Sequence, residues 1–240
     1  MVTVDVFTLG YNEECILPHF INHYKQFCRN ITFYNNCSTD NSVDICKSMG
    51  VNVIDTNLNE LNDVANIAIK NNSYQKSNAD FVIVVDTDEL VYHPNIIKLL
   101  KYYKKNNITL PKVRGYTMAS EKGYPKNDEL LINHVKTGII APNYAKRCIF
   151  NPKLSIAWTP GQHGISKLNG PIVESEQQDI SILHYKFLSL EEQQKKAKVY
   201  SQRMSVANKA SNLGSHYNHY NEEKINKWFQ EHIDGALTVI

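Results

Sequence analysis

The sequence predicts an α/β fold in which a mostly parallel β-sheet is flanked by helices and followed by a helical C-terminal extension. Two observations lead to this prediction. Over residues 2–105, short segments rich in β-branched residues alternate with segments whose apolar residues recur at helical spacing. Residues 81–85 are all apolar, which is typical of a strand buried on both faces of a parallel sheet. The alternation indicates β-α-β units with right-handed crossovers.

The N-terminal part supplies the predicted sheet. Pro18 suits the first turn of a helix, and the turn over residues 38–40 (STD) is a helix-capping signal. A longer helix over 61–75 is expected to turn Val64, Ile67 and Ala68 inward. Strands are expected over residues 2–9, 31–35, 51–55 and 81–85, and a further helix over 95–105.

The pattern changes after about residue 110, where strand candidates stand among Gly and Pro with no regular helix between them. These predicted strands cover residues 113–118, 146–150, 156–159 and 180–185. Two helical patterns, over 190–208 and 222–233, follow. A length of 240 residues suits one domain with a C-terminal appendage.

Composition and charge exclude several classes of protein. With 42% hydrophobic and 21% charged residues, the chain is neither disordered nor collagen-like. A net charge of +2 gives no reason to expect a nucleic-acid partner. Five Cys without a C-x-x-C pair argue against a disulfide framework and favour a reducing, cytoplasmic compartment. No stretch approaches the roughly 20 apolar residues that span a bilayer, so we expect any membrane contact to be peripheral.

An acidic pair follows the buried strand directly. Asp86 and Asp88 stand at the carboxyl end of the strand, where open α/β sheets bind their ligands. Alternate residues of an extended segment point the same way, so both carboxylates can face one target. Mg²⁺ or Mn²⁺ bridged to a diphosphate would neutralise them. The alternative is that these acids cap the helix that follows.

Three segments in register resemble glycosyltransferases of family 2, which have the GT-A fold. Residues 8–14 (TLGYNEE) look like the family's first strand and its Tyr-Asn-Glu turn. Residues 33–40 (FYNNCSTD) look like its Asp-Asp-Gly-Ser-Thr-Asp segment, and residues 84–89 (VVDTDE) look like its D-x-D motif. Glu89 makes the last motif similar to a D-x-D-E subgroup.

The resemblance covers residues 2–105 well and implies the domain organisation. It implies a GT-A type, Rossmann-like sheet within a glycosyltransferase domain at residues 1–210. Within it, residues 1–110 would be the nucleotide-binding half and 111–190 the acceptor-binding half. Residues 211–240 would be a C-terminal helical appendage.

The resemblance also implies where the nucleotide binds. Asn35 stands where the family often has an Asp, and its amide suits uracil or thymine, so UDP or dTDP is favoured over GDP. Helix capping explains Asp40 equally well, and a solvated helix face explains Asp63. The residues expected at the nucleotide are Leu9, Tyr11, Glu13, Asn35, Asp40, Asp63, Asp86 and Thr87.

Further candidates complete the implied site. Asp86, Asp88 and a late His184 would hold Mn²⁺ or Mg²⁺, and Lys146 and Lys186 would offset the diphosphate charge. The catalytic candidates are Asp128, as the base that deprotonates the acceptor, and His163, in a Gly-flanked loop that would bind sugar hydroxyls. Glu121, Glu174 and Asp179 remain alternatives to Asp128 as the base. The alternatives are a structural His for His184, a buried turn for His163 and scattered surface cations for the two lysines.

Together with the resemblance, these features predict a metal-dependent glycosyltransferase of polysaccharide biosynthesis, and the resemblance alone implies that it is inverting. It would transfer a sugar from a nucleotide diphosphate sugar to a hydroxyl of a glycan or lipid-linked acceptor. A basic helix with Lys195, Lys196, Lys198 and Arg203 would either contact anionic lipid or expose a solvated face. The alternatives are a nucleotidyltransferase, against which the acidic turn after the first strand argues, and a non-catalytic nucleotide- or sugar-binding module.

Overall fold

The computed structural model describes residues 1–126, 129–214 and 220–240. Its first sheet has the order β3-β2-β1-β4-β8, in which the first four strands are parallel and the last is antiparallel. The predicted α/β class with a largely parallel sheet is confirmed. The strands are β1 (Val4–Gly10), β2 (Asn30–Asn35), β3 (Asn52–Asp55), β4 (Phe81–Asp86) and β8 (Ile149–Phe150), joined in part by α1 (Leu17–Tyr24), α2 (Ser42–Ser48) and α3 (Asp63–Ser73).

A second, mixed sheet stands beside the first and has the order β12-β7-β6-β11-β5. Two further strands, β9 (Ser155–Trp158) and β10 (Ile165–Asn169), form a separate hairpin. β5 comes from the first half of the chain but pairs in the second sheet, and β8 comes from the second half but pairs in the first sheet. The two halves of the chain therefore each contribute a strand to the other's sheet. The second sheet consists of β5 (Glu89–Tyr92), β6 (Val113–Ala119), β7 (Thr137–Ile140), β11 (Ile180–Phe187) and β12 (Leu237–Thr238), accompanied by α4 (Ile96–Lys105) and α5 (Leu131–His134).

The sequence reading missed four strands: β5, β7, β10 and β12. Each has two to five residues, which is too short for a clear period-2 pattern. Only two residues, Thr87 and Asp88, separate the end of β4 from the start of β5, so the acidic segment lies in a tight strand connection and does not cap α4.

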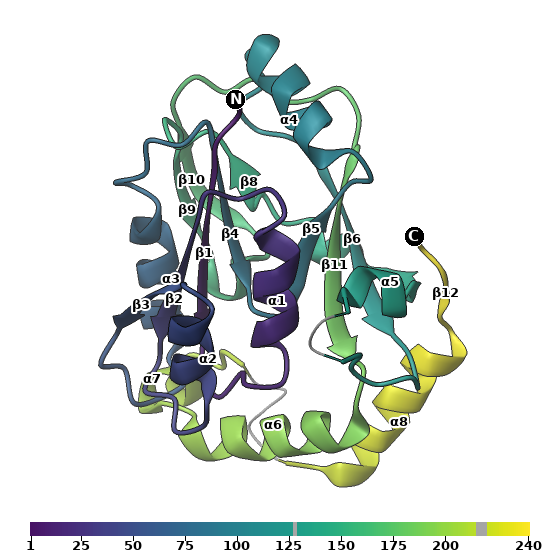
Figure 1. Ribbon diagram of the computed structural model, residues 1–240. Coiled ribbons are helices and arrows are strands. Elements are labelled where there is room, and N and C mark those ends of the chain that lie inside the picture. The colour runs from purple at the N-terminus through teal and green to yellow at the C-terminus, as the bar shows by residue number, and fades with distance from the viewer. Residues whose placement is uncertain (127–128, 215–219) are drawn as a thin grey trace.

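The described part of the C-terminal segment contains three helices where two were predicted. The helix expected over 190–208 is divided at Met204 into α6 (Leu190–Arg203) and α7 (Val206–Ala210). Ser205 caps α7, with its Oγ accepting from the Asn208 N–H at 3.0 Å. Figure 1 shows α6 running across the lower end of the molecule, between α7 and α8 (Glu222–Asp234). No helix in the described part of the chain is long and apolar enough to cross a membrane.

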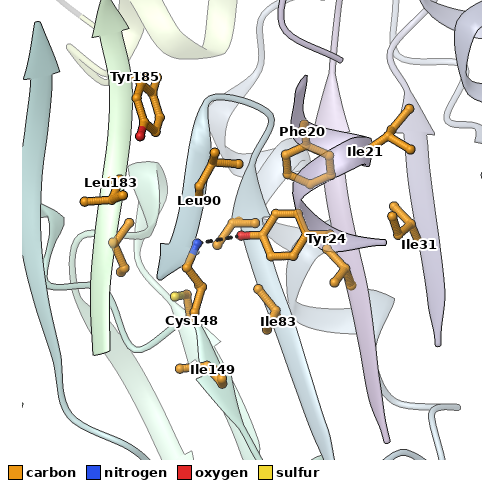
Figure 2. Close-up of a cluster of buried hydrophobic side chains, with 14 of the residues drawn as sticks. Phe20, Ile21, Tyr24, Ile31, Ile83, Leu90, Cys148, Ile149, Leu183 and Tyr185 are labelled. Atoms are coloured by element: carbon orange, nitrogen blue, oxygen red, sulfur yellow. Dashed lines mark hydrogen bonds between the residues drawn. The ribbon is translucent and has the colours of Figure 1, made fainter. Parts of the chain in front are cut away.

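The largest core cluster lies between α1 and the two sheets and positions the acidic segment (Figure 2). Tyr24 of α1 is fully buried there. Its hydroxyl donates to the Glu89 carbonyl at 2.9 Å and accepts from the Val91 N–H at 2.9 Å. Because both partners belong to β5, the core holds the strand that directly follows Asp88.

Candidate active site

A cavity of about 440 Å³ lies at the carboxyl ends of the parallel strands. The strand register places Leu9 beside Asp86 and Gly10 beside Asn35, so these ends meet at one edge. Gly10 permits close packing there, since a Cβ would lie 2.9 Å from Glu13 Cγ. The predicted site residues that line the cavity are Leu9, Tyr11, Glu13, Asp63, Asp86, Thr87, Asp88, Lys146, His163, His184 and Lys186.

Asp86 is held by two lysines. Lys70 of α3 donates to its Oδ1, and Lys146 donates to its Oδ2 at 3.0 Å. Burial would raise the pKa of Asp86, but Lys146 and Lys70 outweigh burial and hold the pKa well below its usual value. Lys146 also lies 2.5 Å from Oε1 of Glu89, which is fully buried. The first carboxylate of the acidic pair is therefore ionised and already paired.

Asp88 faces a different partner. Its Oδ2 lies 3.3 Å from Nε2 of His184, as the strand pairing requires. β11 runs antiparallel to β5 with His184 opposite Glu89, and the Tyr185 N–H donates to the Asp88 carbonyl at 2.7 Å. Burial would raise the pKa of Asp88, but His184 and Lys196 outweigh burial and lower it. The Tyr144 ring packs 4.2 Å from the His184 ring.

This pair suits a divalent cation by its chemistry. A carboxylate with an imidazole is a donor set for Mn²⁺, whereas Mg²⁺ prefers oxygen alone. Nδ1 of His184 is buried and makes no hydrogen bond to any described residue. Residues 1–126, 129–214 and 220–240 contain no group of three or more His, Cys, Asp or Glu side chains suited to a metal. Among the described residues, Asp88 and His184 would thus be the ligands, and substrate oxygens or water would complete the shell.

Glu13 lies beside this pair and is nearly buried. The Glu13 N–H donates to Oγ of Ser42 at 2.8 Å, and Lys196 of α6 lies 3.0 Å from both carboxylate oxygens. Burial raises the pKa of Glu13 to about 7, with Lys196 acting in the opposite direction. A buried carboxylate of this kind requires the nearby ammonium group.

The expected nucleotide end of the cavity is covered by the C-terminal segment. The Arg203 guanidinium lies 3.3 Å above the Tyr11 ring and donates to the Asn36 carbonyl at 3.1 Å. The Asp63 N–H donates to Oδ1 of Asn208 at 2.9 Å, and burial raises the pKa of the Asp63 side chain. Two of the predicted nucleotide residues, Tyr11 and Asp63, are thus in contact with elements that follow β11.

Asn35 and Asp40 do not line the cavity. Oδ1 of Asn35 accepts from the Ser38 N–H at 2.9 Å, and its Nδ2 donates to Asp55 at 2.7 Å. Asp40 accepts from the backbone N–H groups of Glu14 and Ser42 at 3.1 and 2.9 Å. Both side chains hold the connection between β2 and α2, which for Asp40 agrees with the capping alternative.

Of the three remaining candidates, His163 and Lys186 line the cavity, and Asp128 is not among the described residues. His163 lines the cavity, with Nδ1 2.8 Å from the Asn143 carbonyl. Lys186 lies 4.3 Å from the centre of the Trp228 ring, and burial lowers its pKa to about 8. Asp128 lies outside the described residues, so its part as the base stays a prediction.

Sequence reasoning missed several polar residues of the cavity. Lys70 lines the cavity although it is buried, and it donates at 2.9 Å to Oε1 of Gln162, a buried residue behind the lining. Lys70 follows the buried Ile67 by three residues, so both lie on the same face of α3. The helical spacing alone therefore predicts that the Lys70 side chain faces inward. Val64 and Ala68, which were expected to face inward, are exposed. Lys196 and Arg203 are seven residues apart, which places both on one face of α6.

Comparison with known proteins identifies the family. The model of glycosyl transferase family 2 matches residues 5–159, which is more than half of the chain. The chain therefore belongs to glycosyl transferase family 2, as the motifs predicted. No match was found among curated proteins.

Solved structures show more distant likeness. The chain resembles residues 1–349 of TarS from S. aureus at 12% identity, over 84% of this chain and 65% of that chain, with a TM-score of 0.49. It resembles glucosyl-3-phosphoglycerate synthase from Mycobacterium tuberculosis at 18% identity, over 48% of this chain and 44% of that chain, with a TM-score of 0.35. The match thus spans less than two thirds of the TarS chain and less than two thirds of the synthase chain.

Proposed function

We propose that this protein is a metal-dependent glycosyltransferase whose nucleotide diphosphate sugar binds in the cavity at the carboxyl edge of the first sheet. The observation that carries the proposal is the Asp88–His184 pair, 3.3 Å apart, in a cavity that lysines also line. One cavity thereby combines ligands for a cation with donors for phosphate oxygens.

Asp88 and His184 would hold Mn²⁺ or Mg²⁺, which supplies charge stabilisation for the departing diphosphate. Lys186 would donate to the diphosphate, since no carboxylate in residues 1–126, 129–214 or 220–240 lies within ion-pair distance of its ammonium. Lys146, which was also predicted at the diphosphate, is paired with Asp86 and Glu89. It would therefore stabilise the diphosphate through the electrostatic attraction of its positive charge, without a direct hydrogen bond. Asp86 would face the ribose.

The transfer itself needs an acceptor and a base. We propose that a hydroxyl of a glycan or lipid-linked acceptor enters near His163, which is exposed at the cavity. Asp128 is the proposed base, and attack opposite the leaving diphosphate would invert the anomeric centre. The acceptor class implies polysaccharide biosynthesis in the cytoplasm, with peripheral contact at a membrane when the acceptor is lipid-linked.

The donor base is proposed to be uracil or thymine. Asn35 gives both its amide atoms to Ser38 and Asp55, so it would not read the base. Of the predicted nucleotide residues that line the cavity, Tyr11 contacts Arg203 and Asp63 contacts Asn208, and recognition of the base would depend on this edge.

Thermal unfolding with a panel of nucleoside diphosphates, with and without Mn²⁺, tests the proposal. A ligand at 100 times its Kd stabilises the fold by about 2.7 kcal/mol, so we expect a Mn²⁺-dependent rise in Tm with UDP or dTDP. Asp88→Asn should abolish the Mn²⁺-dependent part. Asp44→Asn, an exposed acid on α2, is the matched control and should retain it. A folded wild-type protein that responds to no nucleotide would contradict the proposal.

A further inference from the structure

Helix α6 lies beyond the family match and forms one wall of the cavity. None of its residues is fully buried, and its first residue, Leu190, packs against a small core cluster. Polar contacts also hold it. Gln193 donates to the Lys186 carbonyl, Lys196 pairs with Glu13, and Arg203 stacks on Tyr11. The helix is therefore attached in part through residues of the candidate site.

Lys196 is the lysine of α6 that reaches the centre of the site. Its side chain is 31% exposed, whereas that of its neighbour Lys195 is 61% exposed and lies 3.7 Å from Glu192. Nζ of Lys196 lies 3.0 Å from both oxygens of Glu13 and 3.9 Å from Oδ2 of Asp88. An ammonium group has three N–H donors, and one of them donates to Oε2 of Glu13, so a further donor is available to a ligand beside Asp88.

The other paired lysines of the cavity are less available. The side chains of Lys70 and Lys146 are 8% and 2% exposed and are bound to Asp86, and Lys146 also to Glu89. Lys196 is more accessible, and its charge lies close to the proposed metal ligand. A fixed ammonium in that position is suited to an anionic oxygen.

We propose that Lys196 binds the diphosphate of the donor and stabilises it as it leaves, with Glu13 as the positioning residue that fixes the ammonium. This inference rests on the proposed function. In the transfer, the acceptor oxygen forms a bond to the anomeric carbon while the bond from that carbon to the diphosphate oxygen breaks. The bonding electrons pass to the diphosphate, where Lys196 donates its hydrogen bond, and the acceptor proton passes to the base.

Calorimetric titration of nucleoside diphosphates and the matching nucleosides, in Mn²⁺ buffer, tests this role. Lys196→Gln should weaken binding of the diphosphate about 10- to 100-fold, the usual effect of one hydrogen bond between charged groups. Binding of the nucleoside should change less than about twofold, because the nucleoside lacks the phosphates. Lys195→Gln should bind both like the wild type.

A second comparison separates diphosphate binding from mere neutralisation of Glu13. In Glu13→Gln the buried carboxylate is gone, so Lys196 is no longer needed for charge balance. Adding Lys196→Gln to that variant should still weaken diphosphate binding about 10-fold or more. If the double variant binds as Glu13→Gln does, Lys196 is structural and the inference is wrong. If the wild type binds no diphosphate, the proposed function fails as well.

Discussion

Replacing Lys146 by Met provides a strong test of the charge network under the site. The Lys146 side chain is 2% exposed, and Nζ lies 2.5 Å from Glu89 and 3.0 Å from Asp86. Burial lowers the pKa of Lys146, but the two carboxylates outweigh burial and raise it. Methionine keeps most of the volume and removes the charge. Glu89, which is fully buried, would then be left without a cation, whereas Asp86 would keep Lys70.

The size of the effect follows from the geometry. At an effective dielectric constant of about 20, charges 2.5 Å apart attract each other by about 6–7 kcal/mol, and desolvation of the lysine cancels part of this. Removing one partner of a buried pair typically costs about 3–5 kcal/mol. We therefore expect Lys146→Met to lower the free energy of unfolding by about 3–5 kcal/mol.

Urea denaturation followed by circular dichroism measures this loss. Lys104→Met is the matched control, because Lys104 pairs with Asp80 at 2.7 Å but is 52% exposed, and we expect a cost below about 1 kcal/mol. Adding Glu89→Gln to Lys146→Met should recover about 2 kcal/mol, since no unpaired buried charge then remains. A cost for Lys146→Met no greater than for Lys104→Met would show that Lys146 does not neutralise a buried charge.

Two further predictions concern residues that support the site. Gly115→Ala should destabilise by about 1–3 kcal/mol in urea, because a Cβ would lie 2.4 Å from backbone atoms of Ala141 and Tyr144; a cost near zero would show that this backbone yields freely. Burial lowers the pKa of His23 to about 4 from 6.5, so the folded state binds fewer protons than the unfolded state between these values. The free energy of unfolding should therefore fall by about 2 kcal/mol from pH 7.5 to pH 5, and His23→Gln should flatten this slope; equal slopes would contradict it.

The first half of the fold was predictable because its signals are local. β-branched runs, a helix-capping turn and one fully apolar strand fix the elements up to about residue 105. β5 and β7 depend instead on partners far along the chain, such as β11 and β6, and four residues give little periodic signal of their own. The division of the last long helix at Met204 has a similar origin. The Leu61 N–H donates to the Arg203 carbonyl at 2.7 Å, a contact that local spacing does not show.

The site shows the same contrast. The motif placed Asp88 at the carboxyl edge, and the strand pairing then brought His184 within 3.3 Å of it. Lys70, Lys196 and Arg203 were not assigned to the site, since a lysine or arginine on a helix usually lies on the solvated face. Lys196 and Arg203, which were considered for lipid contact or a solvated face, point into the cavity.

The proposed function requires the cavity to bind and cleave a nucleotide diphosphate sugar. Incubation with a panel of nucleotide sugars and Mn²⁺, followed by chromatography of the nucleotides, measures this reaction. We predict release of a nucleoside diphosphate, by transfer or slow hydrolysis, that requires Mn²⁺, is lost in Asp88→Asn and is retained in Asp44→Asn. If no nucleotide sugar is cleaved, and pyrophosphate is instead released from a nucleoside triphosphate and a sugar phosphate, the protein is a nucleotidyltransferase and not a glycosyltransferase.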